Sequence, residues 1–254
     1  MKLKHSVQFY MQEIAFSCGI YYGVNMLVFL VGGVITIGYS GEADVNVNTS
    51  TDIGTPILVF VWGLLLCGSY IKFFLQNGVS RKTMFTGAAC SIGLLSAAVA
   101  LIDTLVRLLL QWIGNTQMSL YAALYRNGEM FGGDSFSTLP EVLTLWLWTT
   151  FLYLFVGFLG MLVGLAFYRL SKIGKIILGV GLGGSVMILL PLLEAAVTHG
   201  AIVRWFGRTL QFLFGISNPL SPNPYIWVAS AVCLSAVLLL FCFLLFRRAA
   251  PQKA

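Results

Sequence analysis

Two oppositely charged residues lie within one long apolar stretch. Asp103 and Arg107 are four positions apart, so on a helix their side chains share one face. One interpretation is a salt bridge near the membrane interface, in which each charge lowers the desolvation cost of the other. The alternative is a proton or ion relay. We favour the salt bridge, because no other intramembrane carboxylate is there to take up a proton. Asn25 is expected to form a hydrogen bond between helices rather than a substrate contact.

The motifs that common enzyme classes require are missing from the chain. The segment from Lys172 to Ile176 comes nearest to a P-loop, but it lacks the first glycine and has Ile176 where Ser or Thr would bind magnesium. The two histidines, His5 and His199, and the scattered cysteines match no zinc or catalytic spacing. We therefore expect no catalytic residues, no metal site and no cofactor in this chain.

A short basic segment between two apolar stretches has a pattern that predicts the end of one helix and the start of the next. Asn77-Gly78 predicts a left-handed end to the preceding helix, and Ser80 is placed to cap the next one. We call this segment the elbow; it consists of Gln76, Asn77, Gly78, Val79, Ser80, Arg81, Lys82 and Thr83. The alternative is a basic loop that binds lipid phosphates. A second basic turn holds Arg169, Lys172 and Lys175.

Residues 198–217 have an amphipathic pattern with an apolar stripe made of Ile202, Trp205, Phe206, Leu210 and Phe214. The pattern predicts one or two short helices that dip into a membrane leaflet. They form either a wedge against lipid or an external gate, and the candidate gate residues are Arg204, Trp205, Phe206 and Arg208. A turn is expected to follow at Asn218-Pro219.

The elements that must position these residues are membrane helices. Of 254 residues, 58% are hydrophobic and only 9% are charged, more apolar surface than one soluble core can bury. Six apolar stretches are long enough to span a bilayer: residues 14–39, 56–75, 85–113, 142–168, 176–196 and 225–246. The sequence thus predicts an all-α polytopic membrane protein with a single transmembrane domain over residues 1–254. Residues 1–13 form either an amphipathic interfacial helix or an extension of the first span.

The distribution of charge predicts the orientation. If the amino terminus is cytoplasmic, 11 of the 15 Lys and Arg residues fall on the inner side, and eight of the nine acidic residues on the outer side. Both termini are then cytoplasmic, and the basic excess is explained by the membrane rather than by nucleic acid. Three GxxxG pairs permit close helix packing or dimerisation: Gly19/Gly23, Gly160/Gly164 and Gly179/Gly183.

The segment Asn77-Gly78-Val79-Ser80-Arg81-Lys82-Thr83 resembles the coupling elbow of ABC-2-type transporter permeases from Gram-positive bacteria. The turn from Tyr168 to Lys175 and the six-span topology also fit that group. The resemblance implies that residues 76–85 dock on a separate nucleotide-binding subunit, which binds ATP and Mg. It further implies a second permease copy or a different permease as a partner, and helices between residues 197 and 222 that cap the exit side. The short outer loops depart from relatives with a large extracellular domain.

Two hypotheses of function follow. The first is the permease subunit of an ATP-driven exporter in a bacterial cell membrane, which moves an amphipathic substrate such as an antimicrobial peptide or a lipid. The second is a membrane scaffold or accessory subunit that transports nothing.

Overall fold

The computed structural model describes residues 2–40, 51–68, 70, 77–112, 119–125, 138–170, 174, 201–217 and 222–247. Within these ranges nearly every residue is helical and none is in a strand. The helices are α1 (Lys2–Ser40), α2 (Thr51–Gly68), α4 (Arg81–Trp112), α5 (Leu120–Tyr125), α6 (Leu139–Arg169), α9 (Ala201–Phe214) and α10 (Pro224–Arg247). The predicted all-α class is confirmed for this part of the chain.

Three of these helices are long and apolar enough to cross a membrane: Arg81–Leu109 within α4, the whole of α6, and α10. They coincide with the predicted spans at 85–113, 142–168 and 225–246, and they indicate a membrane protein. Helix α1 covers the first predicted span, and α2 contains a shorter apolar helix at Gly54–Leu66. The fifth predicted span, at 176–196, lies outside the described residues.

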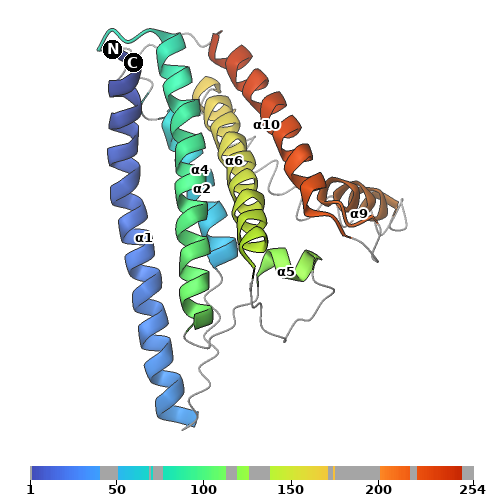
Figure 1. Ribbon diagram of the computed structural model, residues 1–254. Helices are drawn as coiled ribbons and strands as arrows, with labels where there is room; N and C mark the ends of the chain where they lie inside the picture. Colours follow the sequence, from blue (N-terminus) through green and yellow to red (C-terminus); the bar gives the residue numbers. More distant parts are fainter. Residues whose placement is uncertain are drawn as a thin grey trace.

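The long helices lie side by side in an alternating arrangement (Figure 1). Helices α1 and α4 run in one direction, whereas α2, α6 and α10 run in the other. Helix α6 packs against α2, α4 and α10, and α1 packs against α4. The start of α4 and the ends of α6 and α10 meet at one end of the bundle. We call it the basic end, because Arg81, Lys82, Arg169 and Arg247 belong to those helix ends.

The amino-terminal segment and the first predicted span form one unbroken helix, α1. Its buried face consists of Ser6, Tyr10, Ile14 and Cys18, which recur every four residues. This face packs on α4, where Gly87 leaves room for the Ser6 and Tyr10 side chains. The amphipathic start thus continues without a break into the first predicted span, and part of its apolar stripe packs on α4.

Glycines bring α2 and α6 into backbone contact. A Cβ atom at Gly160 would overlap the carbonyl oxygen of Phe60, and one at Gly63 would overlap the carbonyl oxygen of Gly157. The GxxxG pair that includes Gly160 therefore packs within the chain. A Cβ atom at Gly19 would instead meet open space. The pair Gly179/Gly183 lies outside the described residues.

Candidate functional site

The elbow has the local geometry that its sequence predicts. Gly78 has a φ of +69°, the left-handed conformation in which glycine is favoured. The Ser80 hydroxyl accepts a hydrogen bond from the Thr83 amide at 3.2 Å, and α4 begins at Arg81. Ser80 is thus the N-cap of α4. The cap thus joins the elbow directly to the first turn of α4. Gln76 lies outside the described residues.

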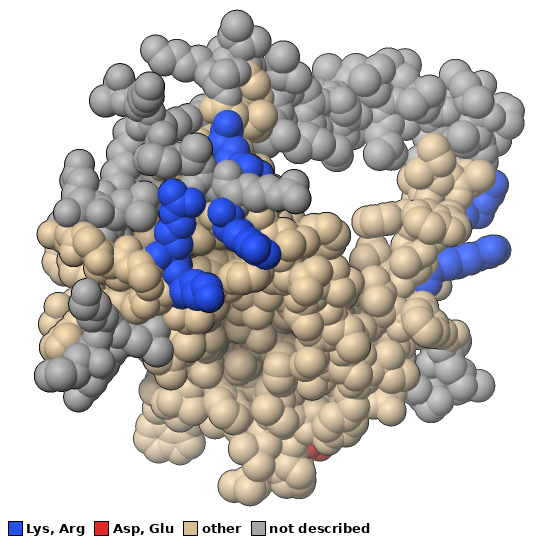
Figure 2. Space-filling model, turned by 90° about the horizontal axis from the view of Figure 1, so that it is seen from above, with Lys and Arg blue, Asp and Glu red and all other residues tan. Residues whose placement is uncertain are grey.

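The basic end presents cations with almost no acidic side chain in view (Figure 2). Arg81 and Lys82 are exposed on the first turn of α4, and Arg247 is exposed on the last turn of α10. These three residues line a groove of about 410 Å³ together with Phe85, Phe243 and Phe246. Arg169 is exposed at the end of α6, while Lys172 and Lys175 of the second basic turn lie outside the described residues.

Asp103 is the centre of a buried polar cluster that joins three helices. Its side chain is 5% exposed, and each carboxyl oxygen accepts a hydrogen bond from a tyrosine hydroxyl. Tyr22 of α1 donates to Oδ1 at 2.6 Å, and Tyr153 of α6 donates to Oδ2 at 2.5 Å. Thr55 of α2 shares a 3.2 Å hydrogen bond with Tyr21 beside this cluster. The carboxyl group therefore ties α1 and α6 to α4.

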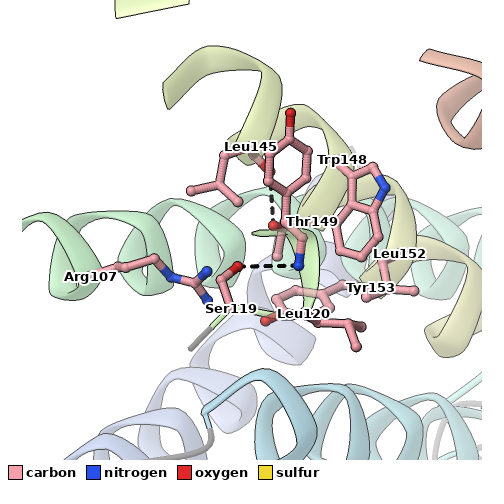
Figure 3. A pocket seen from close by; sticks show the side chains of 9 residues that line it. Arg107, Ser119, Leu120, Leu145, Trp148, Thr149, Leu152 and Tyr153 are labelled. Carbon is pink, nitrogen blue, oxygen red and sulfur yellow. Dashed lines mark hydrogen bonds between the residues drawn. The ribbon is translucent and has the colours of Figure 1, made fainter. Parts of the chain in front are cut away.

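Arg107 lies one turn beyond Asp103 and is also buried, with 9% of its surface exposed. It lines a cavity of about 10 Å³ together with Ser119, Tyr121, Thr149 and Tyr153 (Figure 3). That volume is near the minimum that one water molecule requires, roughly 10–15 Å³. The cavity is therefore too small to be a substrate pathway.

The sequence left two interpretations of Asp103 and Arg107: a salt bridge near the membrane interface, or a proton or ion relay. Arg107 follows Asp103 by four residues on α4, so the two opposite charges share one face of that helix. Tyr22 and Tyr153, which donate to the two carboxyl oxygens, were not among the predicted site residues. Asp103 lies roughly 33 Å along α4 from Arg81, a length comparable to the hydrocarbon layer of a bilayer, which is about 30 Å thick. Asn25 was expected to bond another helix; it donates instead to the Tyr21 carbonyl within α1, at 2.8 Å.

An aromatic cluster holds α9 at the end of the bundle away from the basic end. The rings of Phe214 and Trp227 stack in parallel, with centroids 4.2 Å apart. The Tyr125 hydroxyl donates to the Phe214 carbonyl at 2.6 Å and accepts from Trp148 Nε1 at 3.1 Å. Burial raises the pKa of Tyr125 to about 12, so the hydroxyl keeps its proton at physiological pH. The carboxyl end of α9 is thus tethered to α5, α6 and α10.

The rest of α9 projects away from this tether. None of its residues is buried, and Trp205 and Phe206 are 67% and 56% exposed. Arg204 and Arg208 lie on the same exposed helix. Within the described residues the predicted amphipathic segment forms one helix, and Trp205 and Phe206 present exposed apolar surface on it.

Helix α9 ends at a glycine that was not used in the prediction. Gly215 ends α9 in the left-handed conformation, with a φ of +72°, and its carbonyl oxygen accepts a hydrogen bond from Asn223. Glycine just after a helix is the usual stop signal. The turn predicted at Asn218-Pro219 lies outside the described residues.

The described residues contain no group of three or more His, Cys, Asp or Glu side chains placed to hold a metal ion. No protein-family model, no curated protein and no solved structure matches this chain.

Proposed function

We propose that this chain is the membrane-spanning permease subunit of an ATP-driven exporter, and that a separate subunit hydrolyses the ATP. The observation that carries the proposal is the elbow. Its left-handed Gly78 and the Ser80 cap support a basic first turn that is continuous with the long apolar helix α4. A soluble ATPase needs such a rigid contact to act on a membrane helix.

Helix α4 offers a way to transmit that force. Its basic end carries Arg81 and Lys82, and Asp103 near its other end bonds to α1 and α6. A displacement of the elbow would therefore act on three helices at once. Packed helices move as rigid units rather than bending continuously, which favours transmission over this distance.

The finer architecture belongs to the same proposal. The chain makes six crossings of a bacterial cell membrane with both termini in the cytoplasm, and the basic end faces the cytoplasm. A second permease, either identical or different, completes the pathway. Helix α9, with Arg204, Trp205, Phe206 and Arg208, covers the exit. The cargo is amphipathic, such as an antimicrobial peptide or a lipid, because the spans offer it few charges.

Reversing the charge of the elbow tests the proposal. The doubly substituted Arg81→Glu, Lys82→Glu chain should still insert in the membrane but lose a P-loop ATPase that co-purifies with the unsubstituted chain in mild detergent. The matched control is Arg204→Glu with Arg208→Glu, which makes the same charge change on α9 and should retain the ATPase. If the unsubstituted chain purifies without an ATPase in several detergents, the docking proposal fails.

Reconstitution separates a transporter from a scaffold. Vesicles that contain the chain and its ATPase should accumulate an amphipathic substrate only when ATP is hydrolysed. Co-purification of the ATPase without any ATP-dependent movement would instead favour the accessory-subunit function.

A further inference from the structure

The groove at the basic end joins two helices that are distant in sequence. Arg81, Lys82 and Phe85 come from the start of α4, and Phe243, Phe246 and Arg247 come from the end of α10. Its volume is about 410 Å³, several times the roughly 30 Å³ that a water molecule occupies in the liquid. The groove therefore has room for a molecular group that is much larger than a water.

The two kinds of lining residue divide the groove into a charged part and an apolar part. Phe85 contacts Phe243 and Phe246, with ring centroids 5.5 Å and 5.8 Å apart. Phe85 and Phe246 are buried, whereas Phe243 is 39% exposed and presents an accessible apolar surface. The other three lining residues are cations, and none of the lining residues that the structure describes is acidic. An occupant must combine negative charge with apolar surface.

The location of the groove favours a lipid over a soluble anion. All three cations lie at ends of helices that are long and apolar enough to cross a membrane, where the hydrocarbon layer gives way to the headgroups. Basic pockets between membrane helices at this level bind anionic lipid headgroups. The guanidinium group of Arg247 can bond two phosphate oxygens at once, which the planar fork of arginine allows.

We propose that this groove is a binding site for an anionic phospholipid, with the phosphate between the three cations and an acyl chain against Phe243. The site depends on α10 as much as on the elbow, so it does not rest on the proposed function. A lipid held there bridges α4 and α10.

Lipid binding by the purified full-length chain tests this site. Native mass spectrometry would compare phosphatidylglycerol with phosphatidylcholine of the same acyl chains. We expect preferential retention of phosphatidylglycerol by the unsubstituted chain. Arg247→Gln should weaken that retention by about fivefold, the effect of one basic residue on binding to an anionic lipid. Phe243→Ala should weaken the retention of both lipids at this site.

Two matched variants separate this site from general surface charge and from misfolding. Arg169→Gln removes a cation from the same end but outside the groove, and it should leave retention unchanged. Arg247→Lys keeps the charge and should retain most of the binding. Equal retention of both lipids by the unsubstituted chain, or equal losses in Arg169→Gln and Arg247→Gln, would overturn the proposal.

A third set of measurements distinguishes lipid binding from binding of a soluble anion, and separates the lipid site from docking of an ATPase. Inorganic phosphate and glycerol 3-phosphate should not displace phosphatidylglycerol at millimolar concentration; displacement would identify a soluble-anion site instead. Arg247→Gln should still co-purify an ATPase if the elbow docks one. Absence of the ATPase from the unsubstituted chain would refute docking without changing the lipid result.

Discussion

Asp103 shows how a single carboxyl group can organise several membrane helices. Both of its oxygens are bonded to tyrosine hydroxyls, one from α1 and one from α6. Burial of a polar group without partners costs several kcal/mol in an apolar medium, roughly 4–8 kcal/mol on a cyclohexane scale. The helices gain stability by meeting where these partners are supplied. The 10 Å³ cavity beside Arg107 continues the polar region towards α5.

Removing one of these hydroxyl groups should weaken the bundle measurably. Tyr153→Phe deletes the bond to Oδ2 and leaves the ring in place, so we expect a loss of about 1–2 kcal/mol in the free energy of unfolding. The measurement is denaturant unfolding in detergent micelles. Tyr225→Phe is the matched control, because its hydroxyl bonds Thr144 at the exposed surface. A similar loss in both variants would contradict a special role for the Asp103 cluster.

At the scale of the elements, backbone contact between α2 and α6 determines how the centre of the bundle packs. Gly157, Gly160 and Gly164 of α6 lie against α2 so closely that a Cβ atom on any of them would crowd atoms of that helix. Without a hydrophobic driving force between helices in lipid, such close van der Waals contact is a main source of association. The packing therefore depends on the absence of side chains.

Adding one methyl group at this contact should separate the two helices. Gly160→Ala places a Cβ atom against the Phe60 carbonyl and should cost about 1–3 kcal/mol of unfolding free energy. Gly19→Ala, in the first of the three GxxxG pairs, meets open space and should be neutral or stabilise α1 by up to about 1 kcal/mol. Thermal unfolding in detergent would compare the two. Equal stability would show that the helices adjust without cost.

The start of α4 and the end of α9 can be anticipated from short stretches of sequence, whereas the position of α5 cannot. Gly78 and Ser80 signal the start of α4 within a few residues, because caps act through local hydrogen bonds. Gly215 marks the end of α9 in the same local way, although it was not used in the prediction. The short helix α5, in contrast, depends on contacts of Tyr121 and Tyr125 with Trp148. Those residues are far apart in the chain.

At the scale of the whole molecule, the alternating helices place their basic ends together. The start of α4 and the ends of α6 and α10 share the basic end, while α5 and α9 lie away from it (Figure 1). In the proposed orientation this end faces the cytoplasm, because cytoplasmic loops carry an excess of Lys and Arg. The elbow and the lipid groove then face the same compartment.

Cysteine labelling in intact cells tests that orientation. In a chain whose own cysteines are replaced by alanine, His5→Cys should react with an impermeant maleimide only after permeabilisation. Thr138→Cys should react in intact cells. Both positions are exposed, and the Thr138 side chain makes no capping hydrogen bond that the substitution would remove. The reverse labelling pattern would show that the protein has the opposite orientation. Labelling of both cysteines from the same side would refute the proposed crossings.

The sequence alone determined the membrane class, the helical class, the elbow with its cap, and the end of the bundle where positive charge gathers. These properties depend on apolar run lengths, local hydrogen bonds and counts of charge, all of which are contained in short windows. Only the tertiary structure decided that Asp103 bonds tyrosines 81 and 50 positions away, and that Phe243 and Arg247 complete a groove with Arg81. In a bilayer, the faces of a helix towards lipid and towards protein are both apolar. The hydrophobic pattern therefore cannot indicate which face meets which partner.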